Sequence, residues 1–171
     1  MFSTNLFRVY TNPDVVGCEV AGALKNVIAI ASGMADGLGA GDNTRAAVIT
    51  RGLAELSRLG VAMGGNELTF AGLAGMGDLL ATCISPQSRN RHVGEQLGRG
   101  RSIDEVVAEM NMVAEGVKTA PVVLDIGAEF GIDVPISSQV YAVCHQGRPA
   151  AEAYEGLLRK GSGVEHPNLD F

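Results

Sequence analysis

Apolar residues along this chain follow helical spacing over most of its length. The pattern is densest between positions 15 and 34, where apolar residues occupy most of the helix circumference, and Asp14 is well placed to cap that helix. A helix that is apolar on nearly all sides belongs in the interior of a fold. The sequence therefore predicts a long central helix at about 15–34.

A second, amphipathic helix is expected at about 43–63, because apolar residues recur on one of its faces and two glycines follow it (Ile49, Leu53, Leu56, Met63; Gly64, Gly65). The glycine-rich segment 33–43 follows a helix. It lacks the preceding strand and following helix of a dinucleotide-binding loop, so it is interpreted as a connector.

Shorter helices are predicted over the rest of the chain, at about 67–83, 88–97, 102–110, 119–130, 135–144 and 150–160. Two of them carry clear start signals. Ser88 is a good N-cap, and Ser102 with Glu105 forms a capping box. The fold class is therefore mainly α, a multi-helix bundle.

One segment departs from this pattern. Residues 6–11 alternate and include β-branched and aromatic residues, as a half-buried strand does. Nothing downstream pairs with it convincingly, so it is interpreted either as an orphan strand from a sheet outside this chain or as a segment without fixed structure here. The predicted organisation is a strand remnant at 1–13, a helical domain at 14–162 and a tail at 163–171.

Composition narrows the function classes. The chain has 171 residues, 46% hydrophobic and 19% charged, which fits one folded domain with a real core. Its net charge of −6 argues against nucleic acid or an anionic membrane as the main partner, and a small anionic ligand remains open.

The cysteines and histidines indicate neither a disulfide framework nor a metal site. Three cysteines without C-x-x-C spacing fit reduced packing thiols, and the three histidines lie far apart (Cys18, Cys83, Cys144; His92, His145, His166). Glu19 and Lys25 interrupt the longest apolar stretch, which is taken to be well short of a membrane span. A cytoplasmic protein without a metal is expected.

Lys25 is the first candidate for chemistry, because it is a lone ammonium on the apolar central helix. Burial disfavours the charged form of an amine and suits it to accept a proton. The alternative is a lysine whose methylenes lie along apolar surface while its charge reaches water.

A second group of polar residues, Asp78 with Ser88, Arg89 and Asn90, could complete a site for a phosphorylated polyol. Arg89 and the free N–H groups of a helix start form an anion site, and Asp78 could hold the Lys25 ammonium. The alternatives are a simple helix cap for Asp78 and a solvated helix start for 88–90.

At these residues the chain closely resembles NAD(P)-dependent glycerol-3-phosphate dehydrogenase of the bacterial type. The resemblance runs over essentially the whole chain and rests on FRVYTN at 7–12, GALKN at 22–26, GDN at 41–43, GMGDL at 75–79 and SRN at 88–90. It covers the family's C-terminal, substrate-binding helical domain, which is similar in fold to the C-terminal domain of 6-phosphogluconate dehydrogenase. The family's N-terminal Rossmann domain is absent.

The resemblance implies reversible reduction of dihydroxyacetone phosphate by NADH or NADPH to sn-glycerol 3-phosphate, a phospholipid precursor. Lys25 matches the catalytic lysine, which also touches substrate. The other implied substrate positions are Asn26, Asp78, Thr82, Ser88, Arg89 and Asn90, and the implied cofactor positions are Arg89, Val113 and Glu115.

Because this chain lacks the strand, glycine loop and helix that hold a pyrophosphate, it is expected to be inactive alone. Two other classes stay open. One is a non-catalytic helical module for dimerisation or partner binding, and the other is a domain of a different β-hydroxyacid-type dehydrogenase. A homodimer, and the choice between NAD and NADP, are left open.

Overall fold

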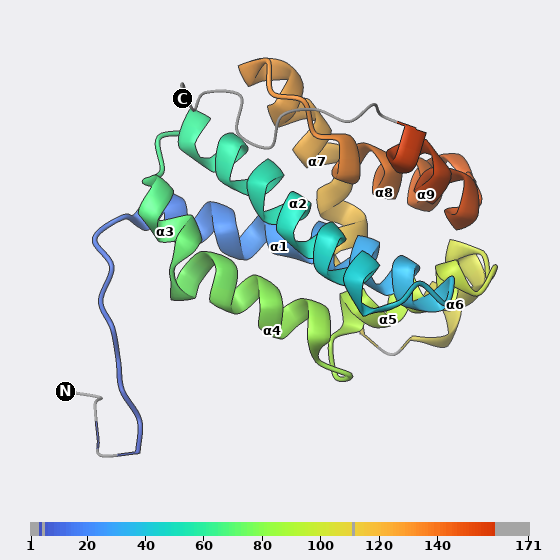
Figure 1. Cartoon of the computed structure of the whole chain (residues 1–171), viewed down its shortest axis with the longest axis horizontal. Helices are drawn as coiled ribbons and strands as arrows, with labels where there is room; N and C mark the ends of the chain where they lie inside the picture. Colours follow the sequence, from blue (N-terminus) through green and yellow to red (C-terminus); the bar gives the residue numbers. More distant parts are fainter. Residues whose placement is uncertain (1–3, 5, 111, 160–171) are drawn as a thin grey trace.

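The computed structural model describes residues 4, 6–110 and 112–159, and all regular secondary structure within them is helical, with no strand (Figure 1). The expected mainly α class is confirmed. The helices are α1 Val15–Gly37, α2 Asp42–Ala62, α3 Glu67–Ala71, the π-helical turn η1 Leu73–Gly77, α4 Asp78–Ile84, α5 Arg89–Gly98, α6 Ile103–Glu109, α7 Glu115–Phe130, α8 Pro135–Gln146 and α9 Ala150–Arg159.

Helix α1 is the centre of the bundle, and α2, α4, α5, α7 and α8 all pack on it (Figure 1). Its apolar residues are buried on several faces, as the sequence pattern predicts. The Asp14 carboxylate accepts the Gly17 N–H at 2.8 Å and, through its other oxygen, the Asn66 N–H at 2.8 Å. The predicted cap is confirmed, and it also ties α1 to the start of α3.

The glycine-rich segment 33–43 is not the connector expected from the sequence, since α1 continues through Gly37. Side chains at Gly33 or Gly37 would overlap the main chain of α5, and side chains at Gly94 or Gly98 would overlap that of α1. Glycines on both helices therefore allow the two backbones to approach closely, and only about 38–41 serves as a connector.

The segment 6–11 forms no strand in this structure, which corrects the strand prediction. Its described residues are exposed, and the part of the chain that the structure describes holds no other strand to complete a ladder. Alternation alone cannot create a strand without a partner. The predicted tail at 163–171, like residues 160–162, lies outside the described residues.

The expectation that no stretch approaches a membrane span also needs correction. By length and composition, α1 with its 23 residues could cross a membrane. In this fold, however, 56% of its most apolar window is buried inside the protein. The apolar character of α1 is therefore explained by its central place in the bundle.

Glu55 is a buried carboxylate that joins α2 to the start of α8. Its side chain is 2% exposed and accepts the Ile136 N–H at 2.8 Å, the Ser137 N–H at 3.0 Å and the Ser137 hydroxyl at 2.6 Å. Helix α8 begins without a side-chain cap from its own N-cap residue, Val134. Glu55 satisfies those free N–H groups from another helix.

Burial raises the pKa of Glu55, because desolvation of its charged form outweighs the hydrogen bonds from Ser137 and Ile136. The folded chain then binds this proton more tightly than the unfolded chain, so stability falls as pH rises from the unfolded pKa near 4.5 through the folded pKa.

The free energy of unfolding of the unchanged chain, called here the parent, is therefore expected to fall relative to that of a Glu55→Gln variant as pH rises over that interval. Urea unfolding of both proteins from pH 4 to pH 8 measures the difference. A difference that is constant, or that moves in favour of the parent with rising pH, would contradict this assignment.

Candidate functional site

Lys25 and Asp78 form an ion pair between the central helix α1 and helix α4. Their side chains are 19% and 40% exposed, so the pair lies at the edge of the core and remains open to solvent. The predicted meeting of these two residues is confirmed. Lys25 reaches a carboxylate rather than open water, which favours a built site over a lysine that only extends to the surface.

Asp78 is placed by an unusual stretch of backbone. It follows the π-helical turn η1, in which Gly75 is buried so tightly against the Phe70 backbone that no side chain would fit. The Thr82 hydroxyl donates to the Asp78 carbonyl at 2.7 Å. Since π-helical turns concentrate at functional sites, this geometry supports a role for Asp78 beyond capping.

Ser88 and Arg89 begin α5. The Ser88 hydroxyl oxygen accepts the Arg91 N–H at 3.2 Å, which confirms the predicted cap. The Arg89 side chain is exposed and forms no ion pair or hydrogen bond with any described residue. The neighbouring Arg91 is instead bound to Asp36 at 2.8 Å. Arg89 is therefore the cation at this helix start that can receive an anionic ligand.

Asn26 and Asn90 hydrogen-bond to one another. The Asn90 side-chain nitrogen donates to the Asn26 side-chain oxygen at 3.0 Å, and the Asn90 side-chain oxygen accepts the Gly116 N–H at 2.9 Å. Asn90 is 8% exposed, so these hydrogen bonds are buried contacts that join α5 to α1 and α7 at the edge of the site. Only one N–H of the Asn90 amide is used in this contact, and the amide has two.

Helix α7 begins at Glu115, four residues earlier than expected from the sequence. Both Glu115 and Val113, which is 53% exposed, point outward near the helix start. The hydrogen bond from Gly116 to Asn90 links this start to α5 and α1. Sequence reasoning missed Gly116, and its signal was a glycine in the first turn of a helix.

The described residues suit contact with only part of a dinucleotide. Arg89 offers a guanidinium, Val113 an apolar surface and Glu115 a carboxylate. Nothing in the described ranges forms the strand, glycine loop and helix that bind a pyrophosphate. These three side chains alone are too few to hold a dinucleotide.

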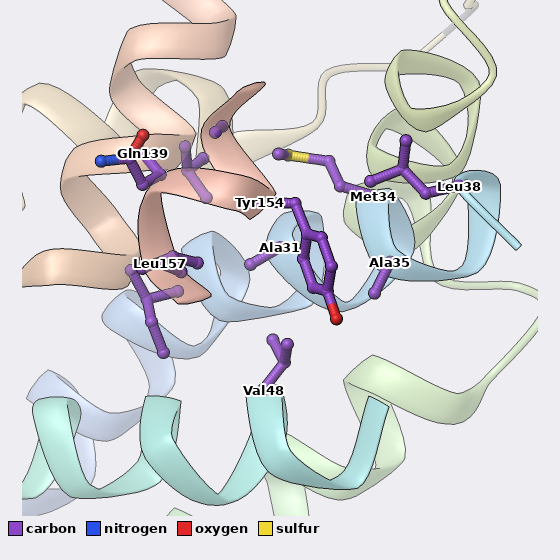
Figure 2. Close-up of a pocket in the computed structure, with 11 residues that line it drawn as sticks. Ala31, Met34, Ala35, Leu38, Val48, Gln139, Tyr154 and Leu157 are labelled. Carbon is purple, nitrogen blue, oxygen red and sulfur yellow. The ribbon is translucent and has the colours of Figure 1, made fainter. Parts of the chain in front are cut away.

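Three further features of the described residues involve none of the predicted site residues. The apolar pocket between α1, α2, α8 and α9 is about 20 Å³, too small for an organic substrate, and no predicted site residue lines it (Figure 2). No cluster of metal-ligating side chains occurs in the part of the chain that the structure describes. Burial raises the pKa of the Cys83 and Cys144 thiols to about 12, in keeping with inert packing residues.

Comparison with known proteins gives a consistent result over nearly the whole chain. A family model described as NAD-dependent glycerol-3-phosphate dehydrogenase C-terminus matches residues 14–155. A Sphingopyxis alaskensis protein named glycerol-3-phosphate dehydrogenase (NAD(P)+) 2 is 61% identical over 168 residues, which cover 98% of this chain and 50% of that protein. A Chlorobium limicola protein named glycerol-3-phosphate dehydrogenase (NAD(P)+) is 55% identical and is covered to 48%.

Comparison with solved structures points to the same family. The crystal structure of glycerol-3-phosphate dehydrogenase from Coxiella burnetii superimposes with a TM-score of 0.88 at 40% sequence identity, over 92% of this chain and 49% of that one. The Saccharomyces cerevisiae enzyme of the same name gives a TM-score of 0.82 at 30% identity. This chain thus spans about half the length of the relatives that it matches.

Proposed function

The chain belongs to the NAD-dependent glycerol-3-phosphate dehydrogenase family, and we propose that it is the substrate-binding domain of an enzyme that reduces dihydroxyacetone phosphate to sn-glycerol 3-phosphate. The observation that carries the proposal is the half-open ion pair between Lys25 and Asp78. Family membership leaves no place for the alternative of a different β-hydroxyacid-type dehydrogenase.

Lys25 is the proposed proton donor. When bound, the cofactor supplies the hydride that reaches the carbonyl carbon of the substrate. The Lys25 ammonium donates its proton to the oxygen of that carbonyl as negative charge develops on it, and the neutral amine takes the proton back in the reverse reaction. Asp78 holds the ammonium in place and balances its charge.

Arg89 is the proposed anchor for the substrate phosphate. It is exposed, and within the described chain no carboxylate neutralises its charge, so its planar guanidinium can bind phosphate oxygens in pairs. The Ser88 hydroxyl can still donate a hydrogen bond, since its oxygen acts as the acceptor for Arg91. Asn26, Thr82 and Asn90 are proposed as further substrate contacts at the same edge.

The cofactor is proposed to be NAD or NADP, bound mainly by another domain and touching Arg89, Val113 and Glu115. We place the enzyme in the cytoplasm, a view that the three free cysteines support. The homodimer and the domain boundaries at 13 and 162 stay proposals.

The test is to join this chain to the N-terminal half of the Sphingopyxis alaskensis relative, giving a protein called here the fused enzyme. It should oxidise NADH or NADPH when dihydroxyacetone phosphate is added, whereas the 171-residue chain alone should not. Arg89→Ala should raise the KM for dihydroxyacetone phosphate by about 10²-fold, as expected for loss of a charged hydrogen bond. A folded fused enzyme without turnover would refute the proposal.

A second candidate role, a non-catalytic association module, has one observation in its favour. Large apolar side chains on η1 and α4 are exposed, namely Leu73, Met76, Leu80 and Ile84. Such surfaces mark contacts between proteins. This role predicts self-association of the chain that persists in a Lys25→Ala, Arg89→Ala variant, and a monomer in sedimentation would count against it.

A further inference from the structure

Helix α7 starts without a cap of its own. Its N-cap residue is Ala114, which has no side-chain acceptor, and Gly116 is the second residue of the helix. The N–H of that position is one that an N-cap side chain normally accepts. Here the acceptor is the side-chain oxygen of Asn90, which belongs to α5 and lies 2.9 Å away in a buried setting.

The Asn90 side chain is fixed from its other end as well. Its nitrogen donates to the side-chain oxygen of Asn26 at 3.0 Å, and Asn26 directly follows Lys25 on α1. Since an N–H must face an acceptor, the bond from Gly116 settles which end of the Asn90 amide points toward α7. One carboxamide therefore connects three helices beside Lys25.

Gly116 adds a steric condition. A Cβ at this position would lie 2.5 Å from the main-chain oxygen of Asn26 and 2.9 Å from the Asn90 side-chain oxygen. Both are too short for real contacts, and one partner is backbone, which cannot rotate away. The close approach of α7 to the Lys25 turn of α1 therefore requires glycine at 116.

We propose that Asn90 is the N-terminal cap of α7, supplied from α5, and that Gly116 is a positioning residue that sets the start of α7 against the turn carrying Lys25. Val113 and Glu115 lie just before Gly116 in the chain, so the contact fixes the distance between the proton donor and the proposed cofactor contacts. The role of Gly116 in the reaction rests on the proposed function, but the capping of α7 does not.

The cap is tested on the 171-residue chain itself by amide hydrogen exchange. Asn90→Leu should speed exchange at Gly116 by about tenfold or more, because it removes a buried acceptor. Asn90→Asp keeps an acceptor and should leave Gly116 at least as protected as in the parent. Unchanged exchange in a folded Asn90→Leu chain, or lost protection in a folded Asn90→Asp chain, would overturn the cap.

The positioning role of Gly116 is tested in the fused enzyme by comparing a Gly116→Ala variant with a Gly22→Ala variant. Gly22 lies on the same helix as Lys25, and a side chain there would meet nothing within 4 Å. Gly116→Ala should lower kcat/KM for NAD(P)H by about tenfold or more, because small displacements of reacting groups cost rate steeply. It should also speed exchange at the start of α7, and Gly22→Ala should do neither.

Equal behaviour of the two alanine variants would overturn the positioning role. An inactive parent fused enzyme would instead refute the proposed function, and the exchange experiment would still decide the cap.

Discussion

Lys25→Ala in the fused enzyme is expected to lower kcat for the reduction of dihydroxyacetone phosphate by about 10³-fold, within the range that general acid catalysis contributes. The ammonium donates the proton that the developing alkoxide needs, and no other lysine lies on α1. The KM should change much less, because Arg89 carries the proposed phosphate contact. Steady-state kinetics of the two proteins measures both quantities.

The matched control is Lys118→Ala, which removes an exposed lysine from α7 and should leave kcat within about twofold, as surface changes usually do. A Lys25→Ala enzyme with the parent kcat would remove Lys25 from the mechanism. An increase confined to KM would make Lys25 a binding residue instead.

Glu55→Ala is expected to cost the chain about 3–5 kcal/mol of its free energy of unfolding. The change leaves the Ile136 and Ser137 N–H groups and the Ser137 hydroxyl without their buried acceptor. Each unsatisfied buried donor lowers the free energy of unfolding. It also leaves a cavity between α2 and α8. The whole free energy of unfolding of a native domain is only about 5–15 kcal/mol, so the variant should be close to unfolding.

Urea unfolding followed by circular dichroism measures the effect. Glu129→Ala is the control, since that glutamate is exposed near the end of α7 and should change stability by less than about 0.5 kcal/mol. Equal stabilities for the two variants would show that Glu55 does not hold α8 in place.

Most of the helices could be predicted from the sequence, because the information that makes them is local. The side chains of Asp14, Ser88 and Ser102 each accept a backbone N–H three residues further along the chain, and all three caps are present. The strand predicted at 6–11 is absent, because a strand depends on contacts that are not local. A strand needs a partner, and the described chain offers none.

The structural roles of the glycines were harder to predict from the sequence than the helices were. Gly33 and Gly37 suggested a connector, yet they lie inside α1 and allow α5 to approach its backbone. Gly116 was missed, because its only signal was a glycine in the first turn of a helix. The same residue type serves turns and close packing, and only the position of the facing helix distinguishes the two uses.

The sequence by itself determined the helical class, the central helix and, through the family motifs, the candidate residues Lys25, Asp78 and Arg89. The sequence offered the pairing of Lys25 with Asp78 as one of several roles for Asp78, and only the tertiary structure decided among them and showed the other long-range pairs. Lys25 meets Asp78 across 53 positions, Asn90 meets Asn26 across 64 and Glu55 meets Ile136 across 81. Periodicity and capping act within one or two helical turns, whereas these pairs form where separate helices pack on α1 or on one another, and sequence spacing does not encode that packing.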